Sequence, residues 1–307
     1  MRVLVTGGAG FLGYHVVRAL ADAGHGALVV DRLDHGRPAD WPDDVPLYAE
    51  DVRTWQPSPR ETADAVLHLA AQADVPSGER NPAAHLDDNV SGTAAALKLA
   101  QDLGARTFCL ASSAAVYGNP EDDGPRAESD QPAPASIYGF SKWAAEELVA
   151  LWHRTRGLDV TVLRPANIYG PGQGEDGEGG VVTQFARSLT EGRPLTRFGD
   201  GQQTRDFIYV EDAALAFCHA AESGSANEAE ARLRVFNVGT GHSTSINQVG
   251  KALASVAGVP LRWHTLPPRP GDIRHSRFQV DRAAAWGFQA RTGLLDGLRR
   301  TWDSLGS

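Results

Sequence analysis

The sequence predicts an α/β fold, in which a doubly wound parallel sheet carries helices on both faces and is followed by a smaller C-terminal lobe. Short β-rich runs alternate with longer amphipathic runs through the first half of the chain. The β-rich runs are almost continuously apolar, which is typical of parallel strands covered on both faces. A glycine-rich turn directly follows the first of these runs. Hydrophobic residues make up 42% and charged residues 22% of the 307 residues, as in an ordinary globular protein.

The elements of the first half follow from this alternation. The predicted strands are Arg2–Thr6, Ala27–Asp31, Leu47–Ala49, Ala65–Ala70, Arg106–Ser112 and Val160–Arg164. The predicted helices are Phe11–Gly24, Ala83–Leu103 and Ile137–Arg156. Ligands of such sheets bind beyond the carboxyl ends of the strands, so the site is expected at that edge.

The sequence pattern changes after Pro165. Residues 170–180 are rich in glycine and acids, and they predict either a mobile loop near a site or a solvated linker. Shorter elements follow, at Val181–Glu191, Asp206–Val210, Asp212–Glu222, Val235–Gly239, Ile246–Ala257 and Thr292–Trp302. We therefore expect residues 1–166 to form the main domain, with residues 206–222 completing its sheet. Residues 167–307 are expected to form mainly the smaller lobe.

Composition excludes several classes of protein. The net charge of −9 argues against a nucleic-acid binder, which needs a basic face. Cys109 and Cys218 form neither a disulfide framework nor a CxxC motif, so we expect buried, inert thiols, a reducing compartment and no metal site. No signal peptide or membrane-spanning run is visible, which favours the cytoplasm and no membrane partner.

The turn after the first strand has the spacing Gly7-x-x-Gly10-x-x-Gly13 and opens a helix. Such a turn brings backbone N–H groups and a helix N-terminus against a diphosphate, as in Rossmann-type dinucleotide sites. Asp31 ends the second strand, where a carboxylate accepts hydrogen bonds from the ribose hydroxyls of NAD and repels a 2′-phosphate. Arg32 leaves NADP open. Asp51 and Val52 are candidates for holding the adenine, or Asp51 is a solvated loop acid.

Tyr138 and Lys142 are four residues apart on a predicted helix, which places both side chains on one face. A tyrosine with a pKa of about 10 is a poor base, but a nearby ammonium and a cationic nicotinamide both favour its phenolate. Ser113 ends the fifth strand, where its hydroxyl can hydrogen-bond a substrate alcohol. These three residues predict an oxidation of a carbinol by a nicotinamide cofactor.

The chain resembles the extended short-chain dehydrogenase/reductase superfamily, in its NAD-dependent nucleotide-sugar epimerase/dehydratase branch. The motifs occur in family order from residue 1 to about 290: Thr6–Gly13, His68–Gln72, Asn89–Thr93, Ser112–Gly118, Tyr138–Lys142, Arg164–Pro171, Gly199–Asp206 and Arg269–Asp272. The resemblance implies that Tyr138 is the base, that Lys142 binds the cofactor ribose and tunes Tyr138, and that Ser113 is the hydroxyl partner. It places Asn89 on a helix beside the site and makes His68 a packed strand residue.

The resemblance also completes the two sets of binding residues. The cofactor NAD is expected to contact Gly7, Gly10, Phe11, Leu12, Gly13, Asp31, Asp51, Val52, Leu69, Ala70, Ala71, Tyr138 and Lys142. The substrate, a nucleotide sugar with UDP favoured, is expected to contact Ser113, Asn167, Arg205, Arg269 and Asp272. Asn167 and the two arginines would hold its diphosphate, which calls for charge-assisted bonds, and Asp272 its ribose.

Ala114 and Ala115 distinguish between the reactions of this family. Dehydratases of the family carry Asp-Glu there, and decarboxylases a glutamate in the second place, whereas alanine moves no proton. The expected reaction is therefore 4-epimerisation of a UDP-hexose or UDP-hexuronate through a 4-keto intermediate. The alternatives are a 4-ketoreductase of a 4-keto-6-deoxy nucleotide sugar and a non-catalytic dinucleotide-binding protein. Helices 83–103 and 137–156 resemble the family's dimer faces, so we expect a homodimer.

Overall fold

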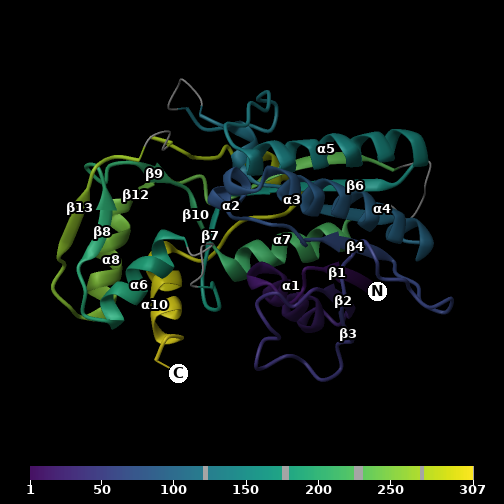
Figure 1. Cartoon of the computed structure of the whole chain (residues 1–307), viewed down its shortest axis with the longest axis horizontal. Helices are drawn as coiled ribbons and strands as arrows, with labels where there is room; N and C mark the ends of the chain where they lie inside the picture. The colour runs from purple at the N-terminus through teal and green to yellow at the C-terminus, as the bar shows by residue number, and fades with distance from the viewer. Residues whose placement is uncertain (120–123, 175–179, 225–230, 270–272, 307) are drawn as a thin grey trace. The chain divides into compact units, whose positions relative to one another are not determined.

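The computed structural model describes residues 1–119, 124–174, 180–224, 231–269 and 273–306, which divide into two compact units (Figure 1). Unit 1 consists of Met1–Val116, Pro134–Arg164 and Ala214–Phe236. Unit 2 consists of Tyr117–Ala133, Pro165–Ala213 and Asn237–Ser307.

Unit 1 is built on a seven-stranded sheet with the order β11-β6-β5-β4-β1-β2-β3. Every pairing between β3 and β6 is parallel, which confirms the predicted doubly wound sheet. The strands are β1 (Arg2–Thr6), β2 (Gly26–Asp31), β3 (Leu47–Ala49), β4 (Ala65–His68), β5 (Thr107–Ala111), β6 (Asp159–Pro165) and β11 (Leu233–Val238).

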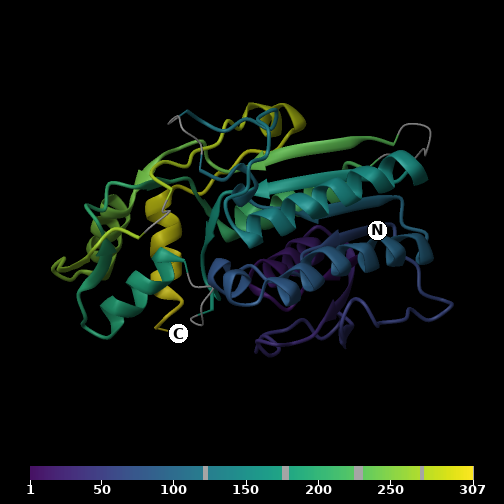
Figure 2. The ribbon, with the colours of Figure 1, turned by 45° about the horizontal axis from the view of Figure 1, so that its top comes forward.

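Helices cover both faces of this sheet (Figures 1 and 2). Leu28 and Val30 pack in one apolar cluster with residues of α4 (Gly92–Asp102) and α5 (Ile137–Arg156). Val29 points the other way, and a Cβ built on Gly8 would contact both Val29 and Val17 of α1 (Phe11–Asp22). This alternation along β2 is the period of two expected of a strand buried on both faces.

The predicted helix 83–103 consists of three consecutive segments. These are α3 (Pro82–Leu86), a π-helical turn η1 (Asp87–Ser91) and α4. At the start of α4, the Thr93 hydroxyl donates to the carbonyl of Asn89 in η1 at 2.6 Å, a side-chain bond that competes with the helical ladder. The short helix α2 (Val75–Arg80), capped by Asp74, precedes them and was not predicted.

The seventh strand is not where the sequence placed it. Residues 206–222 form β10 (Phe207–Tyr209), which pairs with β7 (Asn167–Tyr169), and then helix α7 (Val210–Glu222). The sheet is completed by β11 instead, and the backbone N–H of Val160 donates to the Arg232 carbonyl just before it. An element was predicted at 235–239, but it was assigned to the smaller lobe, whereas β11 belongs to the seven-stranded sheet.

The described residues of unit 2 form three two-stranded ladders and several short helices. The ladders join β10 to β7, β12 (Thr244–Ser245) to β9 (Thr204–Arg205), and β13 (Trp263–Leu266) to β8 (Leu195–Phe198). The helices are α6 (Val181–Thr190), α8 (Ile246–Ala257), α9 (Asp281–Trp286) and α10 (Leu294–Asp303). Residues of α6, α8 and α10 share one apolar core with Tyr169 and Phe207.

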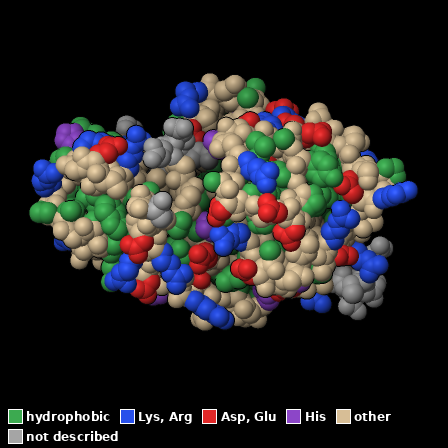
Figure 3. Space-filling model, turned by 90° about the horizontal axis from the view of Figure 1, so that it is seen from below, with side chains coloured by type: hydrophobic (Ala, Val, Ile, Leu, Met, Phe, Trp, Pro, Cys, Tyr) green, Lys and Arg blue, Asp and Glu red, His purple; other side chains and the backbone are tan. Residues whose placement is uncertain are grey.

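Both cysteines are buried, as expected. Burial raises the pKa of the Cys218 thiol to about 11 and that of Cys109 further. No helix within the described ranges is long and apolar enough to cross a bilayer. On the face drawn in Figure 3, basic and acidic side chains are interspersed.

Candidate active site

The glycine turn between β1 and α1 can be formed only by glycine. Gly7 has a φ of +72°, and a Cβ there would lie 2.5 Å from the backbone nitrogen of Ala70. A Cβ on Gly13 would lie 2.0 Å from the Gly7 carbonyl oxygen. Gly10 precedes α1 and has no side chain to cap it, which leaves the N–H groups near Phe11 and Leu12 for an anion. The turn therefore has the shape of a diphosphate cradle.

Asp31 is fixed beside this turn at the end of β2. Its carboxylate accepts hydrogen bonds from the backbone N–H of Ala9 at 3.0 Å and of Leu33 at 2.8 Å. A carboxylate has about four acceptor positions, so it retains capacity for two ribose hydroxyls. Arg32 is paired with Asp88 through both terminal nitrogens, at 3.1 and 3.3 Å, and with Asp34. Arg32, the residue that made NADP an alternative cofactor, is therefore already paired with carboxylates.

The loop after β4 is held against the glycine turn. The backbone N–H of Leu69 donates to the Thr6 carbonyl, and Ala70 contacts Gly7. One step further on, the Asn89 side chain accepts from the Gln72 N–H at 2.8 Å and donates to the Gln72 carbonyl at 3.0 Å. The predicted cofactor residues Leu69, Ala70 and Ala71 therefore lie in a segment whose two ends are fixed.

Asp51 lies after β3 in a dense network of charges. Hydrogen bonds from the Arg53 guanidinium lower the pKa of its carboxyl group, and Arg53 also pairs with Asp87 and Asp88. Its neighbour Val52 lies near Gly92, where a Cβ would be 3.7 Å from the valine side chain. Asp51 is thus a paired carboxylate rather than a fully solvated loop acid.

The predicted catalytic residues lie where α5 begins and β5 ends. The Ser136 hydroxyl caps α5 by accepting from the N–H of Gly139 at 3.0 Å. A Cβ on Gly139 would lie 2.5 Å from the Ala115 carbonyl oxygen, so this glycine lets the helix approach the turn that follows Ser113. The Ser113 hydroxyl accepts from the Ala115 N–H at 3.1 Å. Ala114 and Ala115 form the short helical turn η2 (Ala114–Tyr117) beside it.

Lys142 is buried under this turn, with 6% of its surface exposed. Its ammonium donates to the carbonyl of Ala111, the last residue of β5, at 2.9 Å. Burial lowers the pKa of Lys142 to about 8, against the attraction of the Glu146 carboxylate. Lys142 follows Tyr138 by one helical turn, so the cation lies on the same face of α5 as the phenol.

A buried ion pair supports this region, and the sequence did not reveal it. Glu146 accepts from Arg164 at 2.9 and 2.6 Å, and it also accepts from the Ser112 hydroxyl. Because Ser112 directly precedes Ser113, the pair fixes the end of β5. The sequence feature that could have indicated Glu146 is its spacing of four residues from Lys142 on one helix.

Two buried histidines flank the site. His68 bonds the hydroxyls of Thr6 at 2.7 Å and Thr93 at 3.1 Å, and burial lowers its pKa to about 3, so it is a neutral packed residue as expected. His85, which sequence reasoning missed, packs edge-on against Tyr138 with ring centroids 5.9 Å apart. Within the described residues, neither ring nitrogen of His85 has a hydrogen-bond partner. Burial is the main cause that lowers the pKa of its imidazole, which favours the neutral ring beside Tyr138.

The predicted nucleotide residues belong to unit 2. Asn167 begins β7, is exposed, and pairs in register with Phe207 of β10. Arg205 lies on β9 two residues before Phe207, and its guanidinium donates to the carbonyls of Thr204 at 2.9 Å and Ile273 at 2.6 Å. The backbone N–H of Asn167 donates to the Asp206 carbonyl at 2.9 Å, so Asn167 lies beside the residue that directly follows Arg205.

Arg269 is an exposed residue whose guanidinium lies 3.8 Å from the ring centroid of Phe198. Asp272 and residues 175–179 of the glycine-rich stretch at 170–180 are outside the described residues. Asp206, in the same motif as Arg205, is a buried structural anchor that accepts from the N–H groups of Thr240 and Gly241 at 2.9 Å.

Comparison with known proteins agrees with this geometry. Residues 3–239 match the family described as the NAD dependent epimerase/dehydratase family. A UDP-glucose 4-epimerase of Mycolicibacterium smegmatis is 34% identical, over 98% of this chain and 97% of that protein.

Two solved structures extend the likeness to three dimensions. The UDP-glucose 4-epimerase of Thermotoga maritima, solved with UDP-glucose, superposes with a TM-score of 0.91 at 34% identity, covering 100% of this chain and 99% of the other. The UDP-glucose 4-epimerase of Thermus thermophilus, solved with NAD, gives a TM-score of 0.89 at 33% identity over the same shares. The chain therefore belongs to the NAD dependent epimerase/dehydratase family.

Proposed function

We propose that this protein is an NAD-dependent 4-epimerase of UDP-sugars. The observation that carries the proposal is the placement of Lys142: a buried ammonium bonded to the end of β5 at 2.9 Å, one helical turn from Tyr138. The similarity to UDP-glucose 4-epimerases along the whole chain supports the same reaction.

The residues of unit 1 fit NAD. The glycine turn leaves room only for backbone, so a diphosphate can approach its N–H groups, and Asp31 offers acceptors to ribose hydroxyls. The pairing of Arg32 with Asp88 and Asp34 favours NAD over NADP, because no free cation awaits a 2′-phosphate at this residue. NAD supplies a reversible hydride acceptor when bound.

The chain's own residues then handle the proton and the orientation of the sugar. Tyr138, as the phenolate, accepts the proton of the sugar 4-hydroxyl while C4 is oxidised. Ser113 donates a hydrogen bond to the same oxygen, and the Lys142 ammonium stabilises the phenolate. The 4-keto sugar turns within the site, C4 is reduced from the opposite face, and Tyr138 returns the proton. Nothing is consumed overall, so positioning and one tuned base suffice.

Elimination of water is disfavoured at this site. Ala114 and Ala115 form the turn directly after Ser113, and neither side chain exchanges a proton. In keeping with this, the whole-chain relatives reported above are epimerases. We propose that unit 1 holds the cofactor and the catalytic residues, whereas Asn167, Arg205, Arg269 and Asp272 of unit 2 hold the nucleotide.

Conversion of UDP-glucose to UDP-galactose tests the proposal. The purified protein with NAD should interconvert the two, with products resolved by NMR and no net formation of NADH. Tyr138→Phe should lower turnover by about 10²-fold to 10⁴-fold, because it removes the acid–base group. Tyr48→Phe is the matched control, since that hydroxyl bonds Glu61 and is expected to leave turnover unchanged. Steady consumption of NADH or NADPH with a 4-keto substrate, and no epimerisation, would instead identify a reductase.

We further propose a cytoplasmic homodimer. Phe140 and Leu151 on α5 are 43% and 49% exposed, which is consistent with a helix face covered by a second copy. Light scattering should then give twice the chain mass of 32.7 kDa.

A further inference from the structure

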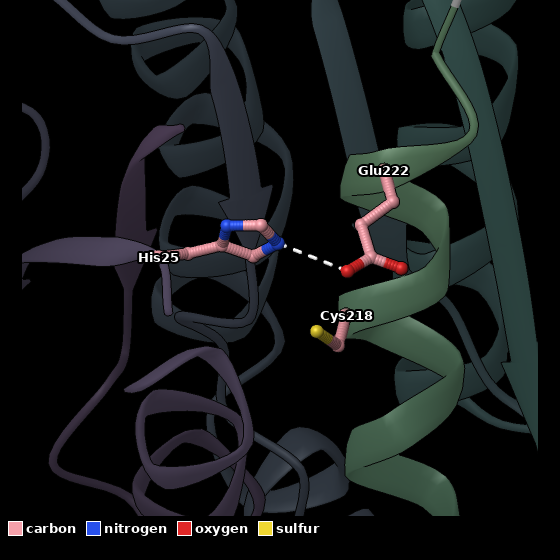
Figure 4. A group of neighbouring side chains, drawn as sticks. All are labelled: His25, Cys218 and Glu222. Carbon is pink, nitrogen blue, oxygen red and sulfur yellow. Dashed lines mark hydrogen bonds and ion pairs between the residues drawn. The ribbon is translucent and has the colours of Figure 1, made fainter. Parts of the chain in front are cut away.

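A group of three potential metal ligands lies in unit 1, apart from the residues assigned to cofactor or substrate. His25 precedes β2, whereas Cys218 and Glu222 lie one helical turn apart on α7 (Figure 4). Their ligand atoms all lie within 4.8 Å of one another, and this is the one such group found among the described residues. We propose that His25, Cys218 and Glu222 bind a single Zn²⁺ ion.

The donor set fits this ion. A thiolate, an imidazole and a carboxylate are each ordinary zinc ligands, and a mixed set of soft and hard donors suits zinc better than Mg²⁺ or Ca²⁺. Three protein ligands leave a fourth tetrahedral position for water, and the side chain of Glu222 is 44% exposed, so solvent reaches the group. The spacing of four residues on α7 directs the thiol and the carboxylate to one side of the helix, towards His25 (Figure 4).

Binding an ion would require the side chains to shift, because their ligand atoms now lie within 4.8 Å of one another. His25 Nε2 lies 2.9 Å from Glu222 Oε1 as a hydrogen bond, whereas zinc bonds of about 2.0–2.3 Å place neighbouring ligand atoms about 3.5 Å apart. The half-exposed Glu222 side chain can move by this amount. The imidazole would carry its proton on Nδ1 when Nε2 binds the ion, so Nδ1 would give up its 3.5 Å contact with the Met1 ammonium, which lies at the outer limit of a hydrogen bond. The Cys218 thiol would release one proton.

The proposed site would join the turn between α1 and β2 to α7. Cys218 already contacts α1, with its sulfur 3.9 Å from the Ala19 carbonyl oxygen, and His25 follows the same helix. The bound ion would therefore stabilise unit 1 without touching Tyr138 or Lys142. The sequence predicted no metal site, because His25 and Glu222 are 197 residues apart and form no motif.

Metal binding by the whole chelator-treated protein tests the proposal. Calorimetric titration with Zn²⁺ should give one equivalent bound, and the ion should raise the melting temperature. Co²⁺ should produce a thiolate-to-metal charge-transfer band in the near ultraviolet. Cys218→Ser should abolish that band. His25→Gln and Glu222→Gln should each weaken zinc binding by at least about 100-fold, because loss of an outer-shell partner alone costs about 10-fold to 100-fold.

The matched controls are His264→Gln and Glu147→Gln, which remove an exposed imidazole and an exposed carboxylate outside the group. Both should bind zinc like the parent protein. Glu222→Gln changes a half-exposed side chain and keeps its shape, so it should fold even if Cys218→Ser does not. Less than one equivalent bound at saturation, or unchanged zinc affinity in folded Glu222→Gln and His25→Gln, would overturn the proposal.

Discussion

The burial of the Lys142 ammonium costs stability. The cation is buried at 6% exposure because its partner, the Ala111 carbonyl, lies at the end of a central strand. Burial lowers its pKa from an ordinary 10.5 to about 8, so the folded protein binds this proton less tightly than the unfolded chain does. Such a cost at a position close to a predicted base is expected where function rather than stability selects the residue.

The pH dependence of stability follows from this shift. Between pH 8 and pH 10.5 the unfolded chain binds more protons at Lys142 than the folded protein does, so the free energy of unfolding rises with pH. Relative to Lys142→Met, the parent protein should gain up to about 3 kcal/mol across this window. Urea unfolding at a series of pH values measures it. Substitution of the exposed Lys98 by Met is the control. A difference in the free energy of unfolding between the parent protein and Lys142→Met that stays constant with pH would contradict the lowered pKa of Lys142.

Asp31 should set the affinity for NAD. Asp31→Asn removes the charge that accepts from Ala9 and Leu33 and faces the expected ribose, so NADH should bind about tenfold more weakly by fluorescence titration. The ratio of the affinity for NADH to the affinity for NADPH should fall in the same variant. Asp34→Asn removes a nearby exposed carboxylate that pairs only with Arg32 among the contacts described. Equal losses of NADH affinity in the two variants would show that the affinity depends on negative charge near the turn in general and not on Asp31 itself.

At the scale of elements, close approaches of backbone position the site. Gly139 allows the first turn of α5 to reach the turn after β5, and Gly7 and Gly13 allow three segments to meet at the end of β1. The sequence indicated the glycine turn, because its spacing is characteristic. It did not indicate Gly139, whose requirement comes from a contact with Ala115 across 24 residues of chain.

Gly139→Ala therefore tests the packing of α5. The added Cβ would meet the Ala115 carbonyl oxygen at 2.5 Å, so the helix start must shift. We expect a loss of about 1–3 kcal/mol in the free energy of unfolding and about a 10²-fold fall in kcat. Gly92→Ala is the matched helical control, since its Cβ would make an ordinary contact at 3.7 Å. That variant should be as stable as the parent or slightly more so. Similar effects of the two substitutions would contradict the role given to Gly139.

Some element boundaries were predictable and others were not, for physical reasons. Helices α5 and α8 begin and end as predicted, because Ser136 and Ser245 cap their first turns and the glycines Gly157 and Gly258 end them. The helix predicted at 83–103 is interrupted by η1, which contains Asn89. The Asn89 side chain bonds the loop after β4 and Ser141, and helical periodicity in the sequence does not indicate such contacts. Local sequence signals can therefore identify helix caps, but they cannot reveal hydrogen bonds between side chains that are far apart in the sequence.

At the scale of the whole molecule, the sequence predicted the kind of sheet but not its last strand. The run at 233–238 follows helix α7, and only its position beside β6 shows that it belongs to the seven-stranded sheet. Similarly, the buried pair of Glu146 with Arg164 and the packing of His85 on Tyr138 join residues distant in sequence. The proposed catalytic residues could be named from the sequence because family motifs carry them, whereas the contacts that support them could not.

The most direct test of the proposed reaction uses UDP-glucose labelled with deuterium at C4 of the sugar. Oxidation and reduction at C4 within one site should carry the label into UDP-galactose without loss, and Tyr138→Phe should form almost none of this product. Mass spectrometry and NMR of the product measure both retention and configuration. Complete retention is the expected result. Loss of the deuterium to water during epimerisation, or normal turnover by Tyr138→Phe, would contradict the proposed mechanism.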